Sequence, residues 1–300
     1  MNTQGKRVVF AGASGFIGSA LKESLADDGW RIKTLIRRDP RGANEYRWDP
    51  NHFDLDPAIV ADTDAVICLN GAPIAKWPWT NSYKRTLVES RLKSVKTIVN
   101  AINTLSPDQR PSTLLTASAV GYYGDRGDWI LTEDDAPSST FLGGLCAEWE
   151  KQSQTAVIDR VINIRTGIVI HEDGGVVNTL LPLFNANLGG RLSGGDQWMP
   201  TISLRDHVRA CKFLLNSELD GAFNLTAPFP VQNKSFTRAL AKHAHRLQGP
   251  PVPAWAIRTL LGDMSVIALD SQRVVPQRLL DAGFEFLDET IDEQLTAGVG

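Results

Sequence analysis

Residues 7–25 read RVVFAGASGFIGSALKESL, and this stretch decides the fold class. An apolar, β-branched run ends at Ala11, glycines follow at three-residue spacing, and Ile17, Leu21 and Leu25 then recur at helical spacing. A strand, a glycine turn and a helix in this order form the first unit of a dinucleotide-binding fold. The stretch therefore predicts a strand over residues 7–11 and a helix directly after the turn.

The glycines of this turn have the GxxGxxG spacing that is found in short-chain dehydrogenases. Gly12 permits a tight turn, Gly15 lets the backbone approach a pyrophosphate, and Gly18 lets the helix pack on the strand. The N-terminus of the helix attracts the negative charge of the phosphates. An ordinary turn is the alternative, which the flanking strand and helix disfavour. The predicted contacts of the cofactor here are Gly12, Ser14, Gly15, Phe16, Ile17 and Gly18.

Apolar β-branched runs alternate with helical segments up to about residue 170, which is typical of a parallel sheet covered on both faces. We expect a doubly wound α/β domain over residues 1–170 and a smaller α+β substrate region over 171–300. No linker marks the boundary, so the two regions can interleave. The predicted strands cover residues 7–11, 31–36, 65–69, 113–116, 160–164 and 222–225, and a long helix includes residues 88–102.

The composition excludes several classes of function. The chain of 300 residues has 31 basic and 34 acidic residues and a net charge of −3, which indicates neither a nucleic-acid partner nor a membrane surface. Cys68, Cys146 and Cys211 lie far apart and form no CxxC pair, and no HExxH occurs, so we expect no disulfide framework and no metal. Without a signal core or an apolar run of 18 residues, we expect a soluble cytoplasmic protein, a monomer or a homodimer.

The end of the second predicted strand indicates which nucleotide is bound. NAD-binding folds place an acidic residue about 20 positions after the glycines to hold the ribose 2′-hydroxyl. Here the chain has Arg37 and Arg38, whose guanidinium groups suit a 2′-phosphate, although Asp39 follows. This favours NADP(H) over NAD(H). A solvated basic pair at a strand end is the alternative.

The order of the motifs resembles a known family. The segments GASGFIG, LNGAPI, ESRLKS, TASAVGYYGDRGD, TEDDAP, NLTAP and SQRVVPQRLLDAGFEF are similar to those of the epimerase-like, atypical branch of the extended short-chain dehydrogenase/reductases. The resemblance covers nearly the whole chain, including the segment from about Gly249 that is distinctive of this branch. It implies an extended Rossmann fold, NADP(H), and a small substrate that is not identified.

The resemblance also assigns roles to residues away from the glycine turn. It places Arg37 and Arg38 at the 2′-phosphate, and Leu69, Asn70 and Gly71 at a strand edge beside the cofactor. Arg91 corresponds to a polar position that faces the cofactor cleft, with an exposed helical arginine as the equal alternative. Because ligands bind at the carboxyl ends of parallel strands, Gly12, Arg37, Asn70 and Ser118 should converge on one crevice.

The catalytic residues expected from the family are only partly present. Extended members use a Ser or Thr near the end of a strand and a Tyr-x-x-x-Lys pair, in which lysine lowers the pKa of the phenol that exchanges a proton. Ser118 stands in the expected place, but Phe141 and Leu145 hold the positions of tyrosine and lysine. Tyr122 and Tyr123 are the nearest phenols, and a tyrosine at a strand end is commonly a core or wall aromatic.

Two functions remain open from the sequence. The first is an NADP(H)-dependent oxidoreductase or nucleotide-sugar epimerase-like enzyme with an unidentified small substrate. The second is an NADP(H)-binding sensor or interaction protein without turnover. Because the Tyr-x-x-x-Lys pair is missing, we expect little turnover of ordinary nucleotide sugars and a dependence of any residual chemistry on Ser118 and on Tyr122 or Tyr123.

Overall fold

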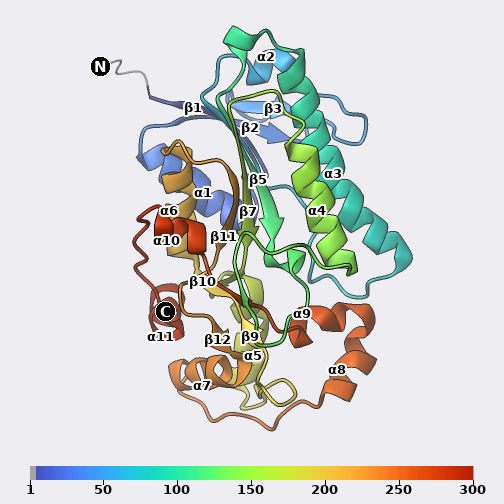
Figure 1. Ribbon diagram of the computed structural model, residues 1–300, viewed down its shortest axis with the longest axis vertical. Coiled ribbons are helices and arrows are strands. Elements are labelled where there is room, and N and C mark those ends of the chain that lie inside the picture. The colour runs from blue at the N-terminus through green and yellow to red at the C-terminus, as the bar shows by residue number, and fades with distance from the viewer. Residues whose placement is uncertain (1–4, 300) are drawn as a thin grey trace.

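A seven-stranded parallel sheet forms the centre of the molecule (Figure 1) in a computed structural model that describes residues 5–299. The strand order is β11-β7-β5-β4-β1-β2-β3. The predicted doubly wound parallel sheet is therefore confirmed. Its strands are β1 (Arg7–Ala11), β2 (Arg31–Ile36), β3 (Glu45–Arg47), β4 (Ala65–Cys68), β5 (Thr113–Ala119), β7 (Arg160–Thr166) and β11 (Gly221–Leu225).

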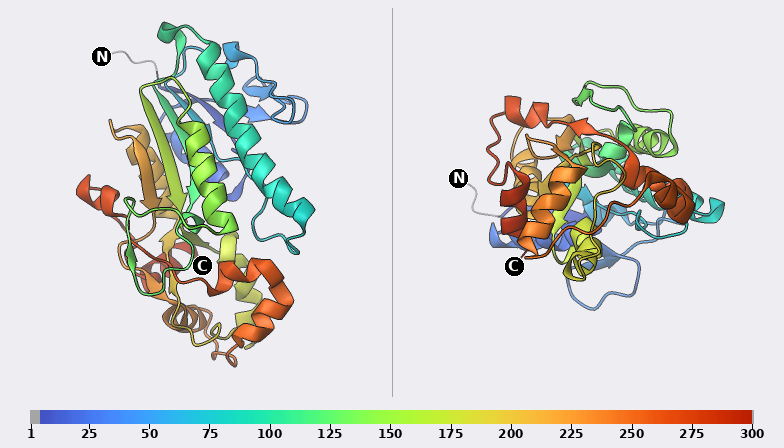
Figure 2. Two further views of the ribbon diagram at one scale, coloured as in Figure 1. Left: turned by 45° about the vertical axis from the view of Figure 1, so that its right-hand side comes forward. Right: turned by 90° about the horizontal axis from the view of Figure 1, so that it is seen from below.

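Helices cover both faces of the sheet (Figure 2). One layer consists of α3 (Asn81–Thr104) and α4 (Phe141–Ser153), and the other of α1 (Phe16–Asp27), α6 (Leu204–Leu215) and the short α10 (Gln277–Asp281). Alternate side chains of β1 enter the two cores, with Val8 and Phe10 toward α1 and Val9 toward α3. Burial on both faces explains why the strand sequence is a continuous apolar run.

Two of the strands that differ from the sequence-based expectation bear on the site. The three residues of β3 were not predicted, because an edge strand of this length with Glu45 and Arg47 has no hydrophobic period. The other is β5, which continues to Ala119, because Ala117, Ser118 and Ala119 pair with the last three residues of β7. Ser118 is therefore held within a strand rather than in the loop after it.

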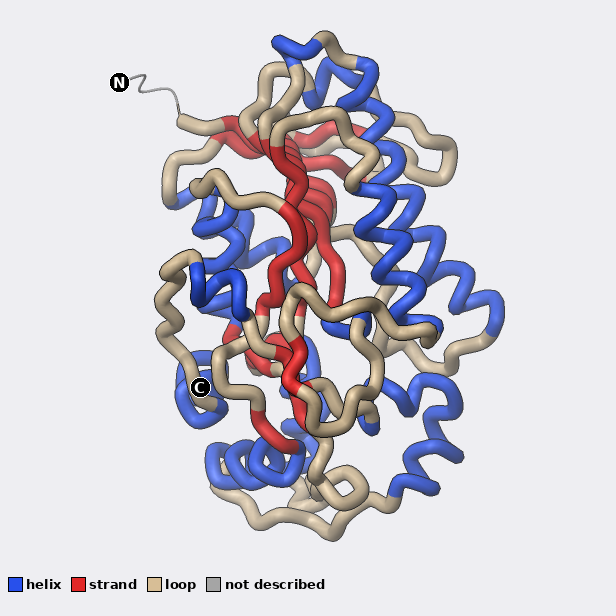
Figure 3. The backbone as a smooth tube through the Cα atoms, in the orientation of Figure 1, coloured by secondary structure: helices blue, strands red, loops and turns tan. Residues whose placement is uncertain are grey.

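Much of the chain after residue 166 forms a smaller region beyond the carboxyl ends of β5 and β7 (Figure 3). Gly221–Leu225, which lies after residue 170, returns to the large sheet as β11 and pairs with β7. None of the helices among residues 5–299 is long and apolar enough to cross a membrane. The remaining strands are β6 (Ile130–Leu131), β8 (Ile168–His171), β9 (Trp198–Met199), β10 (Thr201–Ser203), β12 (Val231–Gln232) and β13 (Arg273–Val274). The remaining α-helices are α2 (Pro57–Val60), α5 (Gly175–Asn185), α7 (Asn233–His243), α8 (Ala254–Leu261), α9 (Val266–Leu269) and α11 (Ile291–Gly298). Three 3-10 turns are η1 (Pro107–Gln109), η2 (Val120–Tyr122) and η3 (Gly262–Ser265).

Candidate functional site

The glycine turn is packed tightly against the end of β4. Gly12 has φ +90°, and a Cβ there would lie 2.8 Å from the carbonyl carbon of Leu69. A Cβ at Gly18 would collide with the carbonyl oxygen of Gly12. At Gly15 a Cβ would lie 3.4 Å from that same oxygen, which is an ordinary contact. Packing within the protein therefore requires glycine at positions 12 and 18 but not at position 15.

The first turn of α1 can accept an anion. Gly15 is the N-cap and has no side chain to bond the free N–H groups, and no acidic residue lies in the first turn. Ser14 and Gly15 are exposed, whereas Phe16 and Ile17 are half-buried. The Phe16 ring contacts the ring of His171 at the end of β8, with 5.9 Å between the ring centroids. The smaller region therefore reaches the phosphate-binding turn.

The two arginines after β2 have different surroundings. Arg38 forms a bidentate pair with Glu45 on β3, at 2.8 and 2.5 Å, and this hydrogen bonding lowers the pKa of Glu45 to about 2. Asp39 pairs with Arg47 at 3.1 Å. Arg37 is exposed, and the structure gives it no ion pair with any residue between 5 and 299. Of the two predicted phosphate ligands, Arg37 is the one whose guanidinium is free.

Strand register brings the predicted residues to one edge of the sheet. Ala11 pairs with both Leu35 and Cys68, so Gly12 lies beside the ends of β2 and β4. Cys68, the last residue of β4, pairs with Thr116, which is two residues before Ser118 on β5. Leu69 and Asn70 are half-buried, and Gly71 lies against the side chain of Arg91. The strand ends that carry the predicted residues therefore lie along one edge of the sheet, and the convergence of these residues on a cofactor stays a prediction.

Ser118 belongs to a buried network of charged residues. Its hydroxyl donates to Glu150 Oε1 on α4 at 2.6 Å. The same carboxylate accepts from Arg165 Nε and Nη2, each at 2.9 Å. Ser118 and Arg165 pair directly across β5 and β7, and they are 3% and 4% exposed. The carboxylate is thus held by two strands and a helix at the carboxyl edge of the sheet.

Glu150 and Arg165 were not among the residues predicted from the sequence. The sequence did indicate that Arg165 is unusual, because it lies within the apolar run VINIRTGIVI (residues 161–170). An arginine inside an apolar strand needs a buried partner. Nothing in the sequence indicates that this partner is Glu150, 15 residues earlier on a helix. Only the packing of α4 on β5 and β7 brings the pair together.

The two predicted tyrosines are not equivalent. Tyr123 is fully buried, accepts from Arg165 Nη1 at 2.9 Å and donates to Asn224 Oδ1 at 2.7 Å. Burial raises the pKa of its phenol, and the hydroxyl has its partners inside the protein. Tyr122 is half-buried, with the Arg165 guanidinium 3.6 Å from its ring centroid. Burial also raises the pKa of Tyr122, and its hydroxyl is the phenol that remains open to a ligand.

The positions of the missing tyrosine and lysine are filled with apolar packing. Phe141 and Leu145 belong to a cluster with Trp79 and Leu87, to which Met264 and Val266 of the C-terminal segment contribute. Lys84 lies 5.4 Å from the Phe141 ring and pairs with Asp263 at 2.5 Å. A tyrosine and a lysine at positions 141 and 145 would therefore place polar groups in this interface.

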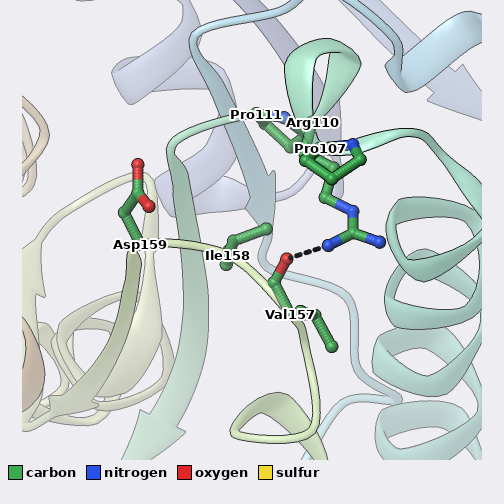
Figure 4. A pocket seen from close by; sticks show the side chains of 6 residues that line it. All are labelled: Pro107, Arg110, Pro111, Val157, Ile158 and Asp159. Atoms are coloured by element: carbon green, nitrogen blue, oxygen red, sulfur yellow. Dashed lines mark hydrogen bonds between the residues drawn. The ribbon is translucent and has the colours of Figure 1, made fainter.

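Two hollows of the surface lie away from Ser118. One of about 270 Å³ (Figure 4) lies at the amino ends of β5 and β7, the end of the sheet opposite to where ligands bind in such folds. It is lined by Pro107, Arg110, Pro111, Val157, Ile158 and Asp159. The other, of about 360 Å³, lies between α1, α6 and α11 and has mixed charges.

Within residues 5–299, no three His, Cys, Asp or Glu side chains come together as a metal site would require.

Comparison with known proteins identifies the family. The model of the NAD dependent epimerase/dehydratase family matches residues 8–226, and a model of a domain of unknown function (DUF1731) matches residues 252–297. The chain belongs to the NAD dependent epimerase/dehydratase family. The resemblance inferred from the sequence motifs is confirmed, together with its distinctive C-terminal segment. A nicotinamide dinucleotide is confirmed as the class of cofactor.

Curated relatives are similar over most of their length. The epimerase family protein Mb2239 of Mycobacterium bovis is 38% identical over 292 residues, which cover 96% of both chains. The chloroplastic SDR39U1 homolog of Arabidopsis thaliana, another epimerase family protein, is 32% identical over 97% of this chain and 86% of its own.

Two solved structures share the fold. Human epimerase family protein SDR39U1 (isoform 2), solved with NADPH, has a TM-score of 0.90 at 24% identity over 97% of this chain and 98% of its own. The nucleoside-diphosphate sugar epimerase of Corynebacterium glutamicum has a TM-score of 0.80 at 27% identity, and the match covers 99% of this chain and 58% of that one.

Proposed function

We propose that this protein is an NADP(H)-dependent oxidoreductase or epimerase-like enzyme that acts on a hydroxyl or carbonyl group of a small molecule. The observation that carries the proposal is the Ser118–Glu150–Arg165 network at the carboxyl edge of the sheet, level with the strand ends that flank the glycine turn. The substrate would lie between this edge and the region after residue 170.

The preference for NADP(H) rests on the end of β2. Arg37 is exposed and unpaired among the described residues, and the nearby carboxylates of Asp39 and Glu45 are already paired with Arg47 and Arg38. No free acidic group is therefore left there to bind a ribose 2′-hydroxyl, whereas a 2′-phosphate would meet a free guanidinium. The similar human structure contains NADPH.

When bound, the cofactor supplies or accepts a hydride. The residues of this chain must then move the proton of the substrate oxygen. Ser118 donates its hydrogen to Glu150, so the lone pairs of its Oγ remain available to a substrate hydroxyl. When a substrate hydroxyl is oxidised, Ser118 Oγ takes the substrate proton as its own proton passes to Glu150. When a carbonyl is reduced, the same two protons move in the reverse direction, from Glu150 to Ser118 and from Ser118 to the substrate oxygen. Arg165 keeps the carboxylate oriented for this transfer, and Tyr122 can donate a hydrogen bond at the same edge.

Steady-state NADPH consumption across a panel of carbonyl compounds and nucleotide sugars tests the proposal. We expect turnover with a carbonyl substrate and little with ordinary nucleotide sugars. Ser118→Ala should lower the rate by about 10² to 10⁴. Ser112→Ala is the matched control, since Ser112 is exposed at the amino end of β5 and bonds to the Asp64 carbonyl.

Two outcomes would count against the proposal. Wild-type turnover that survives Ser118→Ala, Glu150→Gln and Tyr122→Phe would show that the chemistry lies elsewhere. Tight NADPH binding with no turnover across the whole panel would indicate a binding protein rather than an enzyme.

A further inference from the structure

Arg91 is a half-buried cation between α3, α4 and the loop that follows β4. Its Nη1 donates to the Leu87 carbonyl at 3.0 Å and its Nη2 to the Ala72 carbonyl at 3.2 Å. The guanidinium carbon lies 5.2 Å from the centroid of the Trp149 ring on α4. Its tip lies 3.1 to 3.4 Å from where a Cβ at Gly71 would be, so the small residue at the end of β4 makes room for it.

No carboxylate within residues 5–299 forms an ion pair with Arg91. Burial lowers its pKa, and the groups that act against this shift, Cys146 and Tyr83, are not carboxylates. A guanidinium has five N–H donors, of which the two backbone carbonyls engage two. A half-buried guanidinium with donors to spare and no carboxylate partner is suited to bind the phosphate or hydroxyl groups of a ligand.

The position of Arg91 relates it to Ser118. The Cys146 thiol on α4 is fully buried, which raises its pKa to about 11; Arg91 and Ser118 both lie close enough to act in the opposite direction. Cys146 therefore lies near both Arg91 and the hydroxyl at which the proposed proton transfer occurs. Cys146 follows Leu145, the position of the lysine expected from the family, directly along α4.

We propose that Arg91 on α3 binds the nicotinamide mononucleotide half of the cofactor. It would supply the positive charge that the lysine of the Tyr-x-x-x-Lys pair supplies from the helix equivalent to α4. The ribose hydroxyls and phosphate of this half match a guanidinium with free donors. This inference rests on the proposed function, since it takes the cofactor to lie along the carboxyl edge of β4. It makes Arg91 a residue that positions the reacting half, while Arg37 holds the opposite end.

Calorimetric titration with two ligands tests whether Arg91 and Arg37 bind opposite ends of the cofactor. NADPH contains both halves, whereas adenosine 2′,5′-bisphosphate lacks the nicotinamide half. Arg91→Met should weaken NADPH about tenfold or more and leave the affinity for the bisphosphate within about twofold. Arg37→Ala should weaken both ligands. Arg85→Met is the control, because Arg85 is an exposed arginine on the same helix and should change neither affinity.

The outcomes separate this inference from the proposed function. Arg91→Lys keeps the charge and should retain most of the affinity for NADPH. Should Arg91→Met not fold, Arg91→Gln must show the same selective loss, since it keeps donors for the backbone carbonyls. Unchanged NADPH binding, or an equal loss of both ligands, would overturn the role of Arg91. Failure of the wild type to bind NADPH would instead overturn the proposed function.

Discussion

The glycine turn and the network around Arg165 lie at the same edge of one sheet but are assembled in different ways. The turn consists of consecutive residues between β1 and α1, and its internal contacts join Gly12, Gly15 and Gly18. The network joins Ser118, Glu150 and Arg165, which come from β5, α4 and β7. A contiguous site can be recognised in a sequence, whereas a site built by strand pairing cannot. The difference also predicts how each region responds to substitution.

The largest effect is expected in the network. Arg165→Met should lower the free energy of unfolding by about 3 to 5 kcal/mol, because it leaves the Glu150 carboxylate buried without its partner. Urea denaturation measures this loss. The exposed pair of Arg47 and Asp39 provides the contrast, since Arg47→Met should change stability by less than about 1 kcal/mol. Equal losses of unfolding free energy in both variants would show that the buried pair stabilises the protein no more than the exposed pair does.

The opposite face of β7 buries a neutral ionisable group instead of a charged one. His207 on α6 is fully buried, its Nε2 lies 3.0 Å from Thr166 Oγ1, and burial lowers its pKa to about 4. Because the folded-state pKa lies below the unfolded value of about 6.5, the stabilisation is present above pH 6.5 and is lost as the pH falls toward 4. The loss should be roughly 3 kcal/mol.

Denaturation midpoints at pH 7 and pH 4.5 measure this effect. The difference in stability between the two pH values should shrink in a His207→Gln variant, which keeps a polar group without the titration. A variant with the same pH dependence as the wild type would show that other groups cause it.

The glycine turn should separate folding from binding. Gly18→Ala should lower stability by about 1 to 3 kcal/mol, because its Cβ meets the backbone of Gly12. Gly15→Val should fold with little loss and fail to bind NADPH, because the branched side chain would occupy the path of the pyrophosphate. Thermal unfolding and NADPH titration of both variants measure this. Normal NADPH binding by Gly15→Val would place the dinucleotide elsewhere.

The smallest effect is expected at the end of β2. Arg37→Ala should reduce the preference for NADPH over NADH about tenfold, since a charge-assisted pair contributes about 1.5 to 3 kcal/mol. Arg38→Ala should have a much weaker effect, because Arg38 is paired with Glu45. Fluorescence titration with both nucleotides compares the variants. A larger loss in Arg38→Ala than in Arg37→Ala would reverse the assignment of the phosphate ligand.

Sequence by itself determined the features whose residues are neighbours in the chain. The strand, glycine turn and helix of residues 7–25 follow from local spacing, and the basic end of β2 and the motifs of the family are contiguous as well. The loss of the Tyr-x-x-x-Lys pair was also visible, because Phe141 and Leu145 are four residues apart on one helix. Such features depend on short-range geometry, which a run of residue types specifies directly.

The tertiary structure alone decided which distant side chains meet. Pairing of β5 with β7 sets Ser118 opposite Arg165, and the packing of α4 adds Glu150. The short edge strand β3 brings Glu45 to Arg38 and leaves Arg37 free. These contacts depend on strand register and helix packing, which are set by burial across the whole sheet and leave no local pattern in the residues that they join.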